Sequence, residues 1–523
     1  MKTYEIDLKG YGVVRVYGEN RDKARYSAWL NAPRYLKLSF GEFLRRIISM
    51  REIGTRQSDS YTEFIRAKQS TFDGSGRDVP VSMLNPQMFP FERDIVRWGL
   101  KKGRFEGWED CGMGKTLQQL EWARLVCLLE GTSAIGFAPL SVQHQTKAEG
   151  ERFGIQVNII ENQADIRPGI NITNYEKMGK FDYRQFGCVF LDESSILKSF
   201  SGATRNALID TFQDTPYRSG WSATPAPNDY MEIGNHAEFL GVMSRAEMLS
   251  TFFVHDSGDT AKWRLKGHAE DEFWKWVASW AVVMTSPADL GYSSEGYDLP
   301  PLNIVDHIVK SNGTHFDGDG QMMLFRPVVQ TLNDRRAARR NSLAERVRCA
   351  AELANATDDQ VLVWCDLNDE SAALTASIAG AVEVKGADSD AHKIAAMQGF
   401  SAGDVRVLVS KPSIAGWGMN WQNCRNEIFC GVSDSYEAWY QAVRRCWRYG
   451  QQNPVNVHMI TSDAEGAVRE NLLRKQREAE RMRREMVRHT KDILAHDIHG
   501  TARMTEAYKP KKQVELPEWM VAA

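Results

Sequence analysis

The sequence of 523 residues lacks the features that would place it in a membrane or an oxidising compartment. No stretch approaches the roughly 20 consecutive apolar residues of a membrane span, and the N-terminus alternates polar and apolar residues, unlike a signal peptide. The eight cysteines form no Cys-x-x-Cys pair and no zinc-type spacing with histidine. We therefore expect a cytoplasmic protein with reduced thiols and no contact with a membrane.

An excess of charge of one sign is also missing. Sixty-five Lys and Arg residues oppose 68 Asp and Glu residues, which gives a formal charge of −3. This balance excludes a wholly basic surface, so any nucleic acid must bind to local patches. Arginines cluster at 335–348 and 469–488, and they are either phosphate contacts or solvated helix faces.

A glycine-rich turn with the sequence DCGMGKT lies at 110–116, between a predicted strand and a predicted helix. Its glycines let backbone N–H groups converge on phosphate oxygens, its lysine can reach the β- and γ-phosphates, and its threonine hydroxyl can hold Mg²⁺. Glu109 stands where a full P-loop has glycine, so a glycine turn without a nucleotide remains an alternative. The candidate nucleotide-binding residues are Gly112, Met113, Gly114, Lys115 and Thr116.

Two acids follow an apolar run, CVFL at 188–191. A buried parallel strand that ends in Asp192 and Glu193 would place a Mg²⁺-binding aspartate beside a glutamate that orients water. An apolar strand followed by Asp-Glu is on its own only a strand end. Here it comes after the glycine turn and before SATP at 222–225, and this order favours an ATPase site.

Taken in order, these elements resemble the superfamily two helicase-like ATPases, and within them the Swi/Snf-type DNA translocases. The resemblance covers residues from about 84 to 460, and its most specific part is the string at 441–455. The matching strings are APLSV at 138–142 (motif Ia), ITNYE at 172–176 (motif Ib), DESSILKS at 192–199 (the DEAH-Lys element), SATPAPN at 222–228 (motif III), SIAGWGMNWQNC at 413–424 (motif V) and QAVRRCWRYGQQNPV at 441–455 (motif VI).

Motif VI places Arg445 and Arg448 three residues apart, as neighbours on one helical face. The resemblance implies that both act as arginine fingers on the transferring phosphoryl group, with Gln441 beside them. A solvated basic helix is the alternative interpretation. Three aromatic residues nearby, Trp439, Tyr440 and Trp447, are interpreted as core. The same resemblance places Gly416 and Gly418 of motif V at the nucleotide.

Three positions depart from the family pattern. The glutamine expected to read adenine is replaced by Glu92, and a carboxylate lacks the paired donor and acceptor of an amide, which predicts weaker selection of ATP over GTP. The histidine of DEAH is replaced by Ser195, and motif III has SAT where Gly-Thr is commoner in the Swi/Snf group. The coupling between ATP hydrolysis and movement is therefore expected to differ from that in the Swi/Snf group.

The predicted fold is α/β, with two tandem RecA-like parallel-sheet lobes. We expect a small α+β unit at 1–52, a linker at 53–83, the ATP-binding lobe at 84–300 and the second lobe at 301–462. A helical protrusion is expected at about 243–280. A charged helix, too polar all round to be core, and a tail should follow at 463–523.

The favoured function is a Mg-ATP-driven motor that moves along duplex DNA. An ATP-switched clamp that binds or remodels DNA without tracking, and an RNA helicase, are the alternatives. The motor is expected to be monomeric, with residues 1–52 available to a protein partner. Short motors of this kind resemble ones encoded by phages, in which case the compartment is the host cytoplasm.

Overall fold

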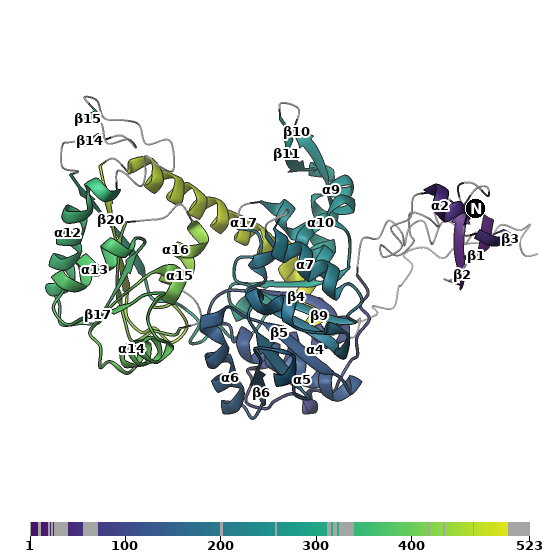
Figure 1. Cartoon of the computed structure of the whole chain (residues 1–523), viewed down its shortest axis with the longest axis horizontal. Helices are drawn as coiled ribbons and strands as arrows, with labels where there is room; N and C mark the ends of the chain where they lie inside the picture. Colours follow the sequence, from purple (N-terminus) through teal and green to yellow (C-terminus); the bar gives the residue numbers. More distant parts are fainter. Residues whose placement is uncertain are drawn as a thin grey trace, which may run out of the picture. The chain divides into compact units, whose positions relative to one another are not determined.

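The chain divides into two compact units, Met1–Ser70 and Thr71–Ala523, in the computed structural model (Figure 1). The structure describes residues 2–8, 12–18, 21, 23, 25, 40–45 and 47–55 of the first unit. In the second unit it describes residues 72–198, 202–227, 229–256, 259–310, 315–316, 322–323, 339–415, 419–431, 435–463 and 465–499. Within these ranges, no helix is both long enough and apolar enough to cross a membrane.

The first unit contains an antiparallel three-stranded sheet in the order β2-β1-β3. Its strands are β1 (Lys2–Leu8), β2 (Gly12–Gly18) and β3 (Ile47–Thr55), and its helix α2 spans Phe40–Arg45. Tyr4, Ile6 and Phe43 are buried in it. Helix α2 ends at Arg45, because the β-branched Ile47 and Ile48 begin β3, which pairs with β1.

Lobe one is built on a seven-stranded sheet in the order β12-β4-β9-β8-β5-β7-β6, in which every neighbouring pair is parallel. The strands are β4 (Arg104–Glu109), β5 (Ser133–Phe137), β6 (Val157–Ile159), β7 (Ile170–Thr173), β8 (Phe186–Asp192), β9 (Tyr217–Trp221) and β12 (Ala281–Met284). The helices are α4 (Pro90–Lys102), α5 (Lys115–Glu130), α6 (Gln143–Arg152), α7 (Ala203–Phe212), α8 (Ile233–Leu240), α9 (Arg245–Phe252) and α10 (Glu270–Ala278).

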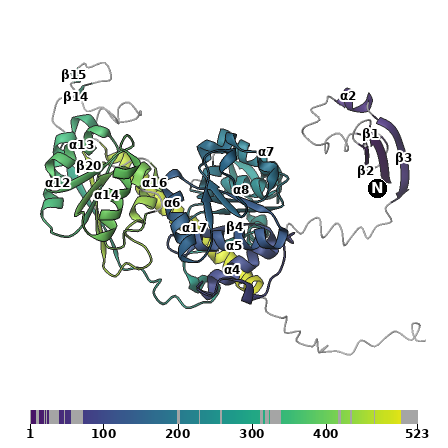
Figure 2. The same ribbon diagram turned by 60° about the horizontal axis from the view of Figure 1, so that its bottom comes forward.

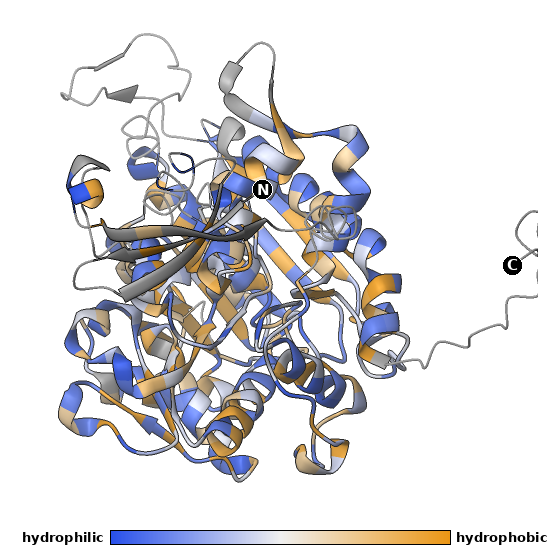
Figure 3. Ribbon diagram, turned by 90° about the vertical axis from the view of Figure 1, so that its right-hand side faces the viewer, coloured by the Kyte–Doolittle hydropathy of each residue, from blue (hydrophilic) through white to orange (hydrophobic). Residues whose placement is uncertain are grey.

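Both faces of this sheet are covered, which explains why its strands are apolar runs without alternation. Val189 and Leu191 of β8 belong to the cluster that includes residues of α7, α8 and α10, whereas Cys188 and Phe190 belong to the cluster with α4 and α5. Polar and apolar stretches alternate along the covering helices (Figure 3). The strand ends are therefore the places where this lobe can present polar groups.

Lobe two has a six-stranded, fully parallel sheet in the order β13-β20-β19-β16-β18-β17. Its strands are β13 (Leu302–Val309), β16 (Val361–Cys365), β17 (Ala381–Val384), β18 (Val407–Ser410), β19 (Asn426–Cys430) and β20 (Val455–Ser462). Its helices are α12 (Leu343–Asn355), α13 (Asn368–Ser377), α14 (Asp390–Ala402), α15 (Pro412–Ala415) and α16 (Tyr436–Val443) (Figure 2). The predicted α/β class with two tandem parallel-sheet lobes is confirmed.

The expected helical protrusion contains strands as well as helices. Between α9 and α10 lies an antiparallel ribbon of β10 (Phe253–Asp256) and β11 (Asp259–Leu265). The pairing of Phe253 with Leu265 places two large apolar side chains opposite each other, and such cross-strand pairs stabilise a ribbon.

Residues 72–83, expected to form part of a linker, are bonded to lobe one. The backbone N–H groups of Ser75, Gly76 and Arg77 donate to the last carbonyls of α4, those of Lys102, Lys101 and Leu100. These carbonyls have no partner within their own helix, so the segment completes the end of α4.

The charged C-terminal helix is α17 (Gly466–His499), and it packs on both lobes (Figure 1). Its Leu472 is buried in the core of lobe two, and its Leu494 and Ile498 are buried against lobe one. Asp497 accepts a hydrogen bond of 2.7 Å from the Trp98 indole. The expectation that this helix is too polar to contribute to a core was wrong, because its few apolar residues are spaced so that they face the lobes.

Candidate nucleotide site

The glycine turn connects the end of β4 to the start of α5, as predicted, and two of its glycines are required by the backbone. Gly112 has φ 91° and Gly114 has φ 79°, a region that other residues rarely adopt. A Cβ on Gly114 would also lie 1.8 Å from Oε1 of Glu92. A substitution at Gly114 would therefore displace the Glu92 carboxyl as well as strain the turn.

Lys115, at the first position of α5, is folded over the turn. Its ammonium donates hydrogen bonds of 2.8 Å to the carbonyls of Glu109 and Asp110. The turn thus holds its lysine with two neutral acceptors. Because phosphate is a charged and stronger acceptor, it would compete for this lysine.

Glu109, the departure from the P-loop pattern, has a structural role. Its side chain is fully buried and accepts a 2.7 Å hydrogen bond from Gln118, whose amide also donates to the Met113 carbonyl at 2.9 Å. Burial raises the pKa of Glu109 to about 7, while Lys115 and Gln118 oppose the shift. Glu109 and Gln118 together brace the turn, a pairing that no motif in the sequence indicates.

Asp192 and Glu193 lie at the carboxyl end of β8, as predicted. Gln119 of α5 donates to Asp192 Oδ1 at 3.3 Å, so the first turns of α5 lie beside this aspartate. Burial raises the pKa of Asp192. It also raises the pKa of Glu193 to about 7, with a further contribution from Asp192. The Ser222 hydroxyl of motif III is 3.4 Å from Glu193 Oε2.

The residues present fit a magnesium nucleotide. The turn supplies glycine N–H groups and an ammonium at the N-terminus of a 16-residue helix, which is a suitable site for phosphate. Thr116 contributes a hydroxyl and Asp192 a carboxylate, and these are the hard oxygen ligands that Mg²⁺ prefers.

The two motif VI arginines do not lie on one helical face, and that prediction was wrong. Helix α16 ends at Val443, and the following turn is held by a hydrogen bond from the Trp421 N–H to the Arg445 carbonyl. Arg445 is buried and donates to the Gln441 carbonyl at 2.8 Å and to the Met419 carbonyl at 3.2 Å. Its burial excludes a solvated helix face.

Arg448 also faces the Met419 carbonyl, at 3.5 Å from Nη1. Burial and the neighbouring Arg445 lower its pKa to about 10. Gln441 accepts from Arg445 at 3.1 Å and lies 3.8 Å from the Cys111 thiol of the glycine turn. Motif VI is therefore next to the turn, with both arginines bonded to their own lobe. Gly416 and Gly418 of motif V lie outside the described residues.

Arg444, to which the family pattern assigns no role, joins the lobes. Its guanidinium lies 3.1 Å from Asp110 Oδ2 and donates to the Cys111 carbonyl at 2.8 Å. Tyr440, interpreted as core, donates its hydroxyl to Asp110 and accepts from Arg483 of α17 at 2.9 Å. Burial opposes the charge of Asp110, but Arg444 and Arg483 outweigh it and lower its pKa.

Removing only one partner of the Arg444–Asp110 ion pair is expected to lower stability substantially. Removing one partner of a buried pair leaves an uncompensated charge, typically at about 3 to 5 kcal/mol. The signal in the sequence was the pair of consecutive arginines in motif VI, of which the family pattern explained only the second.

The arginine cluster at 335–348 is in part a structural network. Arg339 pairs with Asp366 and Glu465, and Arg346 pairs with Glu370 inside lobe two. Both arginines are buried. Arg335 and Arg336 lie outside the described residues. Neither the phosphate-contact nor the solvated-face interpretation holds for Arg339 and Arg346.

Glu92 lies in the third position of α4 with only 4% of its surface exposed, and it accepts a hydrogen bond of 2.9 Å from the Phe89 N–H. Burial, with help from Glu109 and Glu149, raises its pKa to about 8. At pH 7 the neutral carboxyl is favoured, and it offers one donor and one acceptor as an amide does. Two aromatic rings, Tyr297 and Tyr449, stack nearby at 4.5 Å between centroids.

Comparisons with known proteins give one family match. The model of the helicase conserved C-terminal domain matches residues 345–450, which lie in lobe two and end within motif VI. No curated protein sequence matches the chain. The expected resemblance to helicases therefore has a family match in lobe two, over the part of the chain that contains motif V.

Among solved structures, the chain matches the Sulfolobus solfataricus SWI2/SNF2 ATPase core in complex with dsDNA. The match covers 81% of this chain and 99% of that chain, with 16% identity and a TM-score of 0.38. A likeness of this extent says nothing about what the present chain binds.

The raised pKa of Glu92 predicts a pH-dependent effect of Glu92→Gln on stability. The folded chain keeps a proton on Glu92 up to about pH 8, whereas the unfolded chain releases it near pH 4.5. The contribution of Glu92 to stability therefore falls as the pH rises between these values. The variant removes this titration, so its thermal midpoint should match wild type at pH 5 and exceed it at pH 8.

The matched control is Glu151→Gln, which alters an exposed carboxyl in the same lobe. The difference between its thermal midpoint and that of wild type should be the same at pH 5 and at pH 8. If the thermal midpoint of Glu92→Gln differs from that of wild type by the same amount at pH 5 and at pH 8, the assignment of a buried neutral carboxyl is contradicted.

Proposed function

We propose that the chain is a Mg-ATP-driven, Swi/Snf-type motor that moves along duplex DNA. The observation that carries the proposal is that the glycine turn, the two acids of β8 and motif VI of a helicase C-terminal domain meet at one place. Lobe two contacts the turn directly through Arg444 and Asp110. A nucleotide bound at the turn would therefore affect the contacts of both lobes.

Each residue of the turn and of β8 has a distinct role in the proposal. Lys115 would exchange the carbonyls of Glu109 and Asp110 for phosphate oxygens, and Thr116 and Asp192 would hold the metal ion. The bound Mg²⁺ would supply neutralisation of phosphate charge. Glu193 orients the attacking water from its place directly after Asp192.

Arg445 and Arg448 act as arginine fingers once they leave the Met419 carbonyl. In the structure both are bonded to that carbonyl, which keeps them beside the site without engaging the acids. Engagement would require a rearrangement of lobe two against lobe one. This requirement supports a motor whose hydrolysis depends on how its lobes are placed.

Duplex DNA is supported by the charge on α17. Arg477, Arg481, Arg484 and Arg488 are exposed and spaced by four, three and four residues, which places them along one side of the helix. Arg488 is paired with Glu485. The other three form the arginine stripe of α17, and phosphate contacts of this kind are independent of sequence.

The cytoplasm is proposed as the compartment, and reduced thiols fit it. All eight cysteines are free. Burial raises the pKa values of several of them, Cys365 and Cys430 to about 12, so these thiols stay protonated and unreactive.

Lys115→Ala and Glu193→Gln should both abolish hydrolysis, for different reasons. Lys115→Ala removes a phosphate contact and should prevent binding of a fluorescent ATP analogue. Glu193→Gln keeps the phosphate site and should bind and trap the nucleotide. Near-normal turnover by Glu193→Gln would contradict its assigned role.

Arg445→Ala and Arg448→Ala should bind ATP nearly as wild type but lack most of the DNA-stimulated rate. Arginine fingers in related phosphoryl-transfer enzymes contribute about 10³ to 10⁵ in rate. Arg184→Ala, which removes an exposed arginine of lobe one paired with Asp182, is the control and should leave both quantities unchanged. A reduction of the DNA-stimulated rate by only about twofold would contradict the arginine-finger role of Arg445 and Arg448.

The experiment that tests the function compares ATPase rates with no polymer, single-stranded DNA, duplex DNA and RNA. Duplex DNA should stimulate most, and triplex displacement should occur without unwinding of a forked duplex. Replacing the three stripe arginines by alanine should make DNA binding less sensitive to salt. The slope of log affinity against log salt concentration should fall by about 0.9 for each phosphate that is no longer neutralised.

The alternatives give different outcomes in these assays. DNA-stimulated ATPase with neither displacement nor unwinding indicates the clamp, and robust unwinding without displacement indicates a true helicase. Stimulation by RNA alone indicates the RNA helicase, which the SAT sequence of motif III favours.

A further inference from the structure

Glu193 has an unusual backbone. Its φ is 57°, and no other non-glycine residue in the described ranges has a positive φ. This left-handed conformation is unfavourable for a residue with a Cβ, so the surrounding structure must hold it. The residue before it is held by the Tyr175 hydroxyl, which donates to the Asp192 carbonyl at 2.6 Å.

The residue after it is held by Glu106, which lies on β4 and is fully buried. The Ser194 hydroxyl donates to Glu106 Oε2 at 2.8 Å, and the Trp108 indole donates to the same oxygen at 3.1 Å. Space for this carboxylate depends on Gly220 of β9, where a Cβ would lie 2.3 Å from Oε1. The lack of a side chain at Gly220 thus leaves space for the Glu106 carboxyl inside lobe one.

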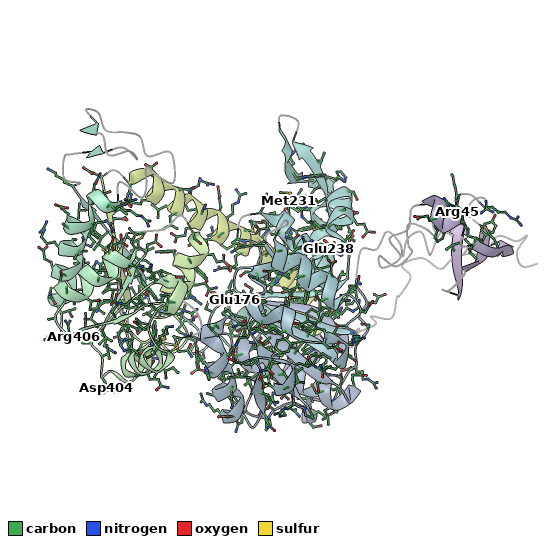
Figure 4. All side chains as sticks on the ribbon, in the orientation of Figure 1. Arg45, Glu176, Met231, Glu238, Asp404 and Arg406 are labelled. Atoms are coloured by element: carbon green, nitrogen blue, oxygen red, sulfur yellow. The ribbon has the colours of Figure 1, made fainter. Side chains whose placement is uncertain are left out.

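His236 of α8 supplies the countercharge. Its Nδ1 is 3.0 Å from Glu106 Oε1, and its Nε2 is 2.9 Å from the Pro225 carbonyl of motif III. Both ring nitrogens therefore face an oxygen that can accept a hydrogen bond, and an imidazolium ring donates to both. Glu106 also raises the pKa of His236 against the opposing effect of burial. Met231 and Glu238, labelled in Figure 4, flank His236 in η8 (Tyr230–Glu232) and α8.

These hydrogen bonds form a chain from Ser194 through Glu106 and His236 to Pro225. Motif III is also linked directly to Glu193 through Ser222, at 3.4 Å. Motif III and the water-orienting glutamate are therefore connected at two points, one direct and one through a buried ion pair.

We infer that Glu106 and His236 are positioning residues that hold the strained turn at Glu193 and tie it to motif III. The inference rests on the proposed ATPase function for its catalytic consequence. A positioning role predicts that breaking the chain of hydrogen bonds lowers kcat while nucleotide binding is retained, because the phosphate site is built by other residues.

Ser194→Ala is the sharpest variant, because it breaks this chain while leaving the buried ion pair in place. We expect kcat for ATP to fall about tenfold and the affinity for a fluorescent ATP analogue to change less than twofold. The matched control is Ser219→Ala, another fully buried serine of lobe one, whose hydroxyl accepts from Trp221 elsewhere in the lobe. It should change neither quantity.

Hydrogen exchange provides a readout that needs no ATPase. The Ile196 N–H donates to the Glu193 carbonyl at 3.1 Å, so exchange of the peptide containing residues 192–198 reports on the turn. Exchange should rise in Ser194→Ala and stay unchanged in Ser219→Ala. His236→Gln, with its fold checked by circular dichroism, should raise exchange at both the turn and motif III.

The outcomes separate the positioning role from the proposed function. An inactive wild-type chain would refute the proposed function, and the exchange comparison would still decide whether Glu106 holds the turn. If Ser194→Ala keeps kcat within twofold and exchanges like wild type, the positioning role is refuted. Equal reductions of kcat in Ser194→Ala and Ser219→Ala would also refute it, because they would show general destabilisation.

Discussion

The site depends on one constraint of the fold: parallel strands all present their carboxyl ends at the same edge of the sheet. In lobe one, β4, β9 and β8 are consecutive neighbours. The glycine turn follows β4, motif III follows β9, and Asp192 and Glu193 end β8. Three segments spread over more than a hundred residues of sequence therefore meet because their strands are adjacent.

Several acidic side chains are removed from water at this edge of the lobe one sheet. Glu106, Glu109, Asp192 and Glu193 lie in or directly after β4 and β8, and each loses hydration there. Isolated buried carboxylates are unfavourable, and positively charged groups near these acids oppose that cost. The imidazolium of His236 compensates Glu106, whereas Lys115 partly compensates the acids around the turn. The charges of the site are thus arranged before any ligand binds.

Part of the contact between the lobes is made by residues to which the family pattern assigns no role. Arg444 and Tyr440 of lobe two and Arg483 of α17 converge on Asp110. Lys115 is bonded to the carbonyl of the same Asp110, and Arg444 also donates to the Cys111 carbonyl, so the turn is connected to lobe two through both residues. Helix α17, which packs on both lobes, lies in this network.

The sequence by itself determined the two parallel-sheet lobes, since apolar strands and helices alternate along it and its motifs occur in a fixed order. It also determined the glycine turn at the start of α5 and the acids at the end of β8, because these depend on local spacing. Tertiary structure alone decided the path of motif VI, where the Trp421–Arg445 hydrogen bond ends the helix. It also raised the pKa values of Glu92 and His236, because the burial of Glu92 and the distant partner of His236, Glu106, set them.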